Sequence, residues 1–242
     1  MSAQTSGSPT RIDEIADGVF RISTKIDAVP GGFTFNQYLI RDEAPALFHT
    51  GPRAIHPLVR DAIATVLPPQ SLRYVGFSHV EADECGSLAE FLALAPNAVA
   101  LCGQVAAMIS GSDLGPRPAK ALAEGETLSL GAHTLRWLDA PHVPHGWDCG
   151  FAFEEHTRTL LCGDLFTQPG GEHPALTDGD ILGPSEAMRA QMGNYFSNAP
   201  HTGAVLEKLA RTEPRLLACM HGAAWRGDGA ALIRELSSRL SG

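Results

Sequence analysis

Apolar and polar residues alternate over short stretches in the first fifty positions, and this period of two predicts strands over residues 19–24, 35–40 and 46–49. The turn-forming residues Asp42-Glu43-Ala44-Pro45 separate the last two strands as a hairpin. Residues 55–66 instead place apolar side chains at helical spacing, and the pair of prolines that follows ends this helix. The chain therefore begins with strands and then turns to helix.

Strands and helices alternate along the rest of the chain. Further strands are predicted over residues 73–78, 98–102, 127–130, 133–138, 150–154, 159–162 and 215–219, and further helices over 86–94, 104–110, 185–196, 202–210 and 229–240. Segments rich in Gly and Pro at 111–118 and 168–184 are predicted loops, either of which could roof a site. This order is typical of two sheets packed face to face with helices outside. We predict one such domain over residues 15–242, after a flexible polar tail over residues 1–14.

The composition is that of an ordinary globular protein, since the 242 residues are 44% hydrophobic and 19% charged. A net charge of −9, without any basic block, argues against nucleic acid or an anionic membrane as a partner. The sequence contains no run of about 18 apolar residues, so no membrane span is predicted. Five cysteines, scattered and without a CxxC pair, argue against disulfides and favour a cytoplasmic location.

The segment Ser78–Gly86 holds the first candidates for chemistry. It follows an apolar run, so it is expected where a buried strand ends and the chain turns into a helix. His79, Glu81 and Asp83 stand at alternate positions, and a loop can bend them around a shared point. Imidazole and carboxylate groups are ligands for a borderline or hard divalent metal. Taken alone, the pattern is explained equally well by a solvated loop of charged residues.

Three further strand ends carry residues of the same kind. They are the Ala140–Gly146 segment with His142 and His145, the Cys162–Phe166 segment with Asp164, and the Cys219–Gly222 segment with His221. An acidic residue buried at a strand end must find a cation or hydrogen-bond donors, and a shared pair of metal ions supplies the cation. Four strand ends carrying such residues therefore indicate a metal site.

In this order the residues resemble those of the metallo-β-lactamase superfamily. They are more closely similar to the diiron domain of flavodiiron proteins and its stand-alone relatives, the oxygen-binding diiron proteins. Hydrolases of the superfamily typically carry HxHxDH, and Glu81 in place of the second His is the flavodiiron mark. The resemblance covers roughly residues 15–240 and implies a four-layer αββα sandwich. Three other segments match the flavodiiron pattern: Asn36–Ile40, Tyr195–Asn198 and His221–Trp225.

The resemblance implies six ligands shared by two metal ions: His79, Glu81 and His145 for the first, Asp83 and His221 for the second, and Asp164 as the bridge. Two iron ions are expected, with manganese or zinc as alternatives, because carboxylate oxygens are hard donors. His142 competes with His145, but the eighteen residues between His145 and Asp164 favour His145. Tyr195 is the candidate catalytic residue, since a phenol beside the metals can donate a hydrogen bond or a proton to bound oxygen. A plain core role for Tyr195 is equally open.

Three departures from the resemblance matter. Glu84 stands where most of the superfamily has His, and it could bind the second metal or point away. His49 stands where the superfamily usually has an Asp that supports the site, so it could still hydrogen-bond a ligand but without a carboxylate charge. Flavodiiron proteins carry an FMN-binding flavodoxin domain after the metal domain. The 242 residues hold no such domain, so we expect no electron source within them.

Two functions follow. In the first, the chain is a non-haem diiron protein that binds or reduces O₂ or NO, with electrons from a separate flavoprotein or a rubredoxin-like partner. In the second, it is a metal-dependent hydrolase in which the metals activate a hydroxide that attacks an ester, thioester or phosphate. A metal-holding domain that binds a partner is a third, non-enzymatic option, and a homodimer is left open.

Overall fold

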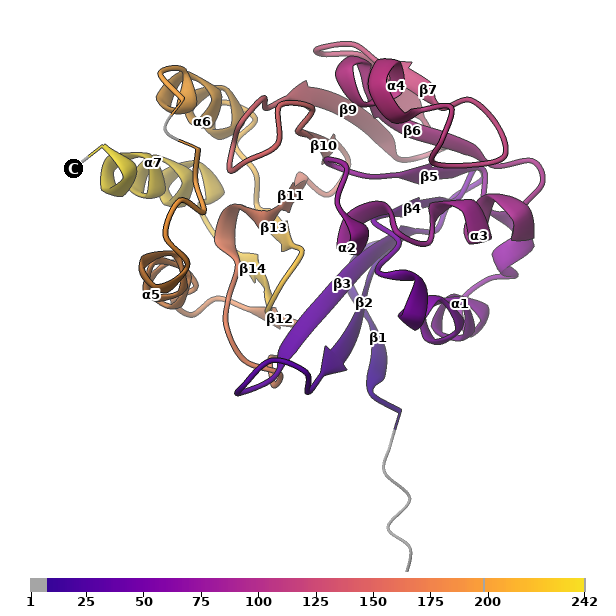
Figure 1. The fold of residues 1–242 in the computed structure, drawn as a ribbon, viewed down its shortest axis with the longest axis horizontal. Coiled ribbons are helices and arrows are strands. Elements are labelled where there is room, and N and C mark those ends of the chain that lie inside the picture. The colour runs from indigo at the N-terminus through magenta and orange to yellow at the C-terminus, as the bar shows by residue number, and fades with distance from the viewer. Residues whose placement is uncertain (1–7, 198, 242) are drawn as a thin grey trace, which may run out of the picture.

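Two seven-stranded sheets form the centre of the molecule in the computed structural model, which describes residues 8–197 and 199–241 (Figure 1). The first sheet runs in chain order: β1 (Thr10–Ala16), β2 (Val19–Ile26), β3 (Phe33–Ile40), β4 (Ala46–Phe48), β5 (Tyr74–Gly76), β6 (Val99–Gly103) and β7 (Lys120–Leu122). The second has the order β12 (Leu176–Thr177), β14 (Ala224–Arg226), β13 (Leu216–Cys219), β11 (Thr159–Gly163), β10 (Gly150–Glu154), β9 (Thr134–Asp139) and β8 (Thr127–Ser129). Strands β4 to β7 are parallel, as are β11 and β13.

Helices lie on the outer sides of the sheets. They are α1 (His56–Ala64), α2 (Ala82–Cys85), α3 (Leu88–Leu94), α4 (Gln104–Ser110), α5 (Leu182–Met192), α6 (Thr202–Ala210) and α7 (Gly229–Leu240), with single 3₁₀ turns η1 (Arg53–Ile55), η2 (Pro69–Ser71) and η3 (Asp164–Phe166). In Figure 1, α5, α6 and α7 flank the second sheet, whereas α1 and α3 flank the first on the opposite side of the molecule. This arrangement confirms the predicted αββα sandwich.

Three apolar cores separate the four layers. The middle core joins side chains of both sheets, among them Tyr38, Phe48, Trp137 and Leu161. The outer cores pack α1 and α3 on the first sheet, and α6 and α7 on the second. The central strands are covered on both faces, which explains why their sequences are continuous apolar runs and do not alternate between apolar and polar residues. A core shared by both sheets is consistent with the predicted single domain.

The predicted tail over residues 1–14 is too long. Thr10–Ala16 forms the edge strand β1, whose antiparallel register runs from Thr10 opposite Thr24 to Ala16 opposite Val19. One face of this strand is polar and half-exposed, so its sequence resembles an unstructured tail. Residues 1–7 of the predicted tail lie outside the described residues.

The helix predicted over residues 185–196 is also misplaced. Helix α5 spans Leu182–Met192 and ends where Gly193 takes a positive φ of 48°. Tyr195 and Phe196 therefore lie in the loop after the helix. The sequence reading also missed β7, β12, β14 and α2, which have two to four residues each and are too short to show a period. None of the helices in the described ranges has the length and apolar character needed to cross a lipid bilayer.

Candidate metal centre

The predicted ligands converge because the strands that carry them end at one edge of the sandwich. His79 lies three residues beyond β5, Asp164 directly follows β11, and His221 lies two residues beyond β13. The loop between β9 and β10 brings in His145. The backbone N–H of Val80 donates to the buried carboxylate of Asp148 (2.9 Å) and ties the His79 loop to the His145 loop.

Asp164 occupies the middle of the cluster. Its Oδ2 lies 3.3 Å from His145 Nε2 and 3.7 Å from His79 Nε2, whereas its Oδ1 lies 3.2 Å from His221 Nε2. The side chain is 3% exposed, so these imidazoles replace the water that a carboxylate normally requires. The two oxygens of one carboxylate therefore face two different groups of side chains.

The two other acidic ligands divide in the same way. Glu81 Oε1 lies 3.5 Å from Nε2 of both His79 and His145, and Asp83 Oδ2 lies 3.4 Å from His221 Nε2. Donor atoms bound at about 2.1 Å to one ion lie roughly 3.0–3.5 Å from each other in octahedral or tetrahedral geometry. The observed separations match that spacing, so the residues fit two ions placed on either side of Asp164.

Each histidine is held by its outer nitrogen, which leaves Nε2 facing the cluster. His221 Nδ1 donates to the Thr34 carbonyl (2.8 Å), and His145 Nδ1 donates to the Tyr195 carbonyl (3.0 Å). The His221 ring also stacks on Phe33, with centroids 4.4 Å apart. Hydrogen bonds of this kind fix both tautomer and ring orientation in metal-binding histidines. His79 Nε2 has no hydrogen-bond partner among the described residues, as expected of an atom reserved for an ion.

His79 is oriented through a relay that ends at His49. The hydroxyl of Ser78 lies 2.9 Å from His79 Nδ1 and 3.0 Å from His49 Nε2. Burial lowers the pKa of His49 to about 3, so the ring is neutral and is able to accept the Ser78 proton. His49 thus supports a proposed ligand at one remove and contributes no charge. The sequence reading identified His49 but missed Ser78.

The electrostatics are those of an acidic cluster in need of cations. Burial alone would lower the pKa of His221, yet the facing carboxylates of Asp164 and Asp83 raise it to about 10. Burial opposes ionisation of Asp164, but hydrogen bonds from His145 and His221 hold its pKa well below the usual range. Burial, and then the neighbouring Asp164 and Asp83, raise the pKa of Glu84 well above its usual range. In the metal-free protein, bound protons supply the positive charge that metal ions would otherwise supply.

The His221 loop depends on residues to which the sequence reading assigned no role. Asn36 Nδ2 donates to the carbonyls of Cys219 and Gly222, and Arg21 reaches the same Gly222 carbonyl. Gln168 pairs with the backbone of Ala223 in both directions. Gly222 has a φ of 91°, and a Cβ there would come within 2.5 Å of Gln168, so only glycine fits after His221.

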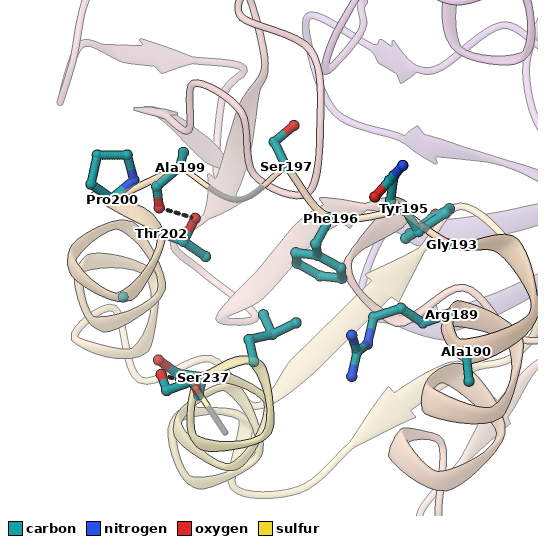
Figure 2. Close-up of a pocket in the computed structure, with 14 residues that line it drawn as sticks. Arg189, Ala190, Gly193, Tyr195, Phe196, Ser197, Ala199, Pro200, Thr202 and Ser237 are labelled. Atoms are coloured by element: carbon teal, nitrogen blue, oxygen red, sulfur yellow. Dashed lines mark hydrogen bonds between the residues drawn. The ribbon is translucent and has the colours of Figure 1, made fainter.

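A cavity of about 470 Å³ opens over the cluster. Phe33, Met188 and Met192 contribute apolar walls, and Glu81, Asp83 and His145 lie at its base. A larger cavity of about 690 Å³ lies between α5, α6 and α7 (Figure 2). The described residues that line this second cavity include no histidine and no carboxylate, so they offer no ligand set for a metal ion. The smaller cavity is the candidate site.

Tyr195 stands between the two cavities and lines both. Its ring packs edge-on against His145, with centroids 5.1 Å apart. Its hydroxyl lies 2.5 Å from Thr167 Oγ1 and donates to the Asp164 carbonyl at 3.2 Å. Burial raises the pKa of Tyr195 well above its usual range, so the phenol stays protonated.

The competing candidates lie elsewhere. His142 is exposed and packs near His201, with ring centroids 6.0 Å apart, rather than entering the cluster. The five cysteines are buried and free, and burial raises the pKa of Cys85 to about 12. The sulfurs of Cys162 and Cys219 lie 3.9 Å apart, well beyond the roughly 2.05 Å of a disulfide bond. The cysteines are small buried residues beneath the site.

Sequence and structure together define the class of protein. Residues 33–222 match the family described as ODP family beta lactamase, and the chain belongs to this family. Within the metallo-β-lactamase superfamily it is close to the flavodiiron proteins.

Particular relatives support this placement. The chain is 30% identical over 210 residues to a rubredoxin-oxygen oxidoreductase of Megalodesulfovibrio gigas, covering 82% of this chain and 50% of that protein. It is 28% identical over 220 residues to a nitric oxide reductase of Moorella thermoacetica, covering 84% and 52%. The crystal structure of a fragment of a putative diflavin flavoprotein from Nostoc sp. superposes with a TM-score of 0.84 at 19% identity, covering 98% of each chain. The chain thus spans about half the length of these curated relatives.

Proposed function

We propose that the chain is a diiron protein that binds or reduces O₂ or NO. In this proposal His79, Glu81 and His145 hold one iron, Asp83 and His221 hold the other, and Asp164 bridges them. The observation that carries it is the placement of Asp164, whose two oxygens face the two histidine groups at 3.2–3.7 Å. One ion would need only one of these groups.

The donor set favours iron over the alternatives, manganese and zinc. Three of the six proposed ligands are carboxylates, and hard oxygen donors suit iron and manganese better than a structural zinc site. Glu81 also adds negative charge where a third histidine would be neutral, which stabilises ferric iron and lowers the electrophilicity needed for hydrolysis.

O₂ and NO are proposed as ligands because the relatives named above are an oxygen oxidoreductase and a nitric oxide reductase. Two reduced iron ions would supply electrons and open coordination positions. The cavity over the cluster has apolar walls on one side, which suit a small uncharged gas. Tyr195 is the proposed catalytic residue, because it lines this cavity and its phenol stays protonated, as a hydrogen-bond or proton donor must.

Electrons are proposed to come from a separate flavoprotein or a rubredoxin-like protein. The names of the relatives include a flavorubredoxin and a rubredoxin-linked enzyme, and the chain covers 41% of the first and 50% of the second. Burial raises the pKa of the nearby Cys85 and Cys162 and keeps these thiols protonated, so neither is suited to supply the electrons. The free cysteines also support the proposed cytoplasmic location.

The proposal is tested by comparing the iron and zinc forms. Protein reduced anaerobically with dithionite should give a new visible absorption band on exposure to O₂ and a different spectral change with NO. The zinc form should show negligible turnover of generic phosphodiesters, lactams and thioesters. Brisk hydrolysis by the zinc form, together with a silent diferrous form, would overturn the proposal in favour of a hydrolase.

A further inference from the structure

Glu84 is fully buried beside the cluster, one residue after Asp83 in α2. Its backbone carbonyl accepts a hydrogen bond from Thr50 N–H (2.7 Å), which fixes the turn of α2 against the loop after β4. Neither carboxylate oxygen of Glu84 has a donor among the described residues. Buried carboxylates are normally paired or hydrogen-bonded, because removing their water is costly. Among the described residues, the side chain that pairs with Glu84 is another acid, Asp83, so the polypeptide supplies no cation at this position.

The side chain of Glu84 reaches both halves of the proposed centre. One of its oxygens lies within 4.8 Å of ligand atoms of His79 and Asp164, and the same holds for ligand atoms of Asp83 and His221. Besides Asp164, which contacts His79, His145 and His221 directly, Glu84 joins the two groups of side chains. A carboxylate in that place is suited to bind an ion.

We propose that Glu84 is a seventh protein ligand, which binds the second metal ion together with Asp83 and His221. This inference rests on the proposed two-metal centre and assigns a role to a position where most of the superfamily has His. The immediate consequence concerns charge. Four carboxylates (Glu81, Asp83, Glu84 and Asp164) with three neutral imidazoles balance two divalent ions, whereas a His at position 84 would leave an excess positive charge. The site is thereby made harder and more selective for iron or manganese over zinc.

The test uses the full chain, stripped of metal and titrated anaerobically with Fe²⁺ against a competing chromophoric chelator. Wild-type protein should bind two ions. Glu84→Gln should bind the second ion at least roughly tenfold more weakly, the scale of disturbing a metal site. The metal-free E84Q variant should melt at a higher temperature than metal-free wild type, because the Gln amide can donate to Asp83 where two carboxyls now face each other.

Glu154→Gln is the matched control. Glu154 is buried to the same extent, but its oxygens accept from Thr157 and from the backbone of His156, away from the cluster. This variant should melt at a lower temperature and still bind two Fe²⁺ with wild-type affinity. The opposite signs of the two melting shifts separate a ligand from a structural carboxylate.

The outcomes are distinct. Unchanged Fe²⁺ affinity in E84Q, with two ions bound, would overturn the role of Glu84 and leave the two-metal centre standing. Fewer than two ions in the wild type would overturn the centre itself and the ligand role with it. Should E84Q not fold, Glu84→Asp takes its place, since it withdraws the carboxylate by one methylene. E84D should weaken the second ion, and wild-type affinity in that variant would contradict the proposal.

Discussion

The molecule contains two buried clusters of histidine and carboxylate that differ in how their charges are satisfied. At the β10–β11 turn, Glu154 accepts from the backbone of His156 and Thr157 and lies 3.0 Å from His133 Nδ1. At the other cluster, neither carboxylate oxygen of Glu84 has a hydrogen-bond donor among the described residues. Both clusters lie at the ends of strands, and the carboxylates of Glu154, Asp164 and Glu84 are buried.

This difference in how the carboxylates are paired distinguishes a structural cluster from a cluster suited to bind metal. A carboxylate whose neighbours are backbone N–H groups and a hydroxyl is satisfied by the fold and needs nothing further. A carboxylate that faces only other acids and imidazole nitrogens needs a cation, which the chain must bind from solution. The first cluster should therefore contribute to stability in the absence of metal, and the second should contribute chiefly when metal is bound.

The largest effect should come from removing the bridge. Asp164→Ala takes away the carboxylate that faces both histidine groups, so metal analysis should fall from two ions per chain to none. Glu154→Ala should keep both ions. Retention of a full metal pair by D164A would refute the bridging assignment.

The structural cluster should show the complementary result. Glu154→Ala strips the acceptor from Thr157 and His156 and leaves His133 without its carboxylate, so the metal-free protein should lose roughly 3 kcal/mol of unfolding free energy. Urea denaturation measures this value. If E154A unfolds at the wild-type urea concentration, the contrast between the clusters fails.

A smaller effect should distinguish His145 from His142. His145→Ala removes a nitrogen that lies 3.3 Å from Asp164, and the affinity for one metal should fall by at least roughly tenfold. His142 is exposed and outside the cluster, so His142→Ala should leave the affinity within error. The reverse result would move the ligand to the other end of this loop.

A further prediction concerns pH. Burial holds the pKa of His49 at about 3, whereas the unfolded chain takes up its proton below about 6.5. The stability that neutral His49 confers is therefore complete above pH 6.5 and is lost as the pH falls toward 3, at up to about 1.4 kcal/mol per pH unit. The Asn side chain of His49→Asn cannot take up this proton. Metal-free H49N should therefore show a shallower loss of stability between pH 6.5 and 4. Parallel curves for wild type and H49N would contradict the buried neutral imidazole.

Much of the fold was predictable because its signals are local. The helices at 104–110, 202–210 and 229–240 and the strand at 150–154 have the predicted bounds, since each carries a clear period or a continuous apolar run. Strand β1 was lost to the predicted tail because an edge strand with a polar outer face has the composition of a tail. Strands β12 and β14 are short, and only the sheet they join identifies them.

The site residues were also predictable only where their signals are local. His79, Glu81, Asp83, Asp164 and His221 could be proposed because each stands in a short motif after an apolar strand. Ser78 and Gln168 could not be proposed, because their roles depend on contacts with loops that are distant in the sequence. The state of Glu84 also required the fold, since only burial and the absence of donors in the described chain distinguish a ligand from a surface carboxylate.

The most direct test of the account is to locate the metals. Crystals of iron-loaded protein, measured by anomalous diffraction at the iron absorption edge, should show two peaks on either side of the Asp164 carboxylate. One peak should lie beside His79 and His145, and the other beside His221. A single peak, or peaks away from Asp164, would contradict the claim that this carboxylate divides two metal positions.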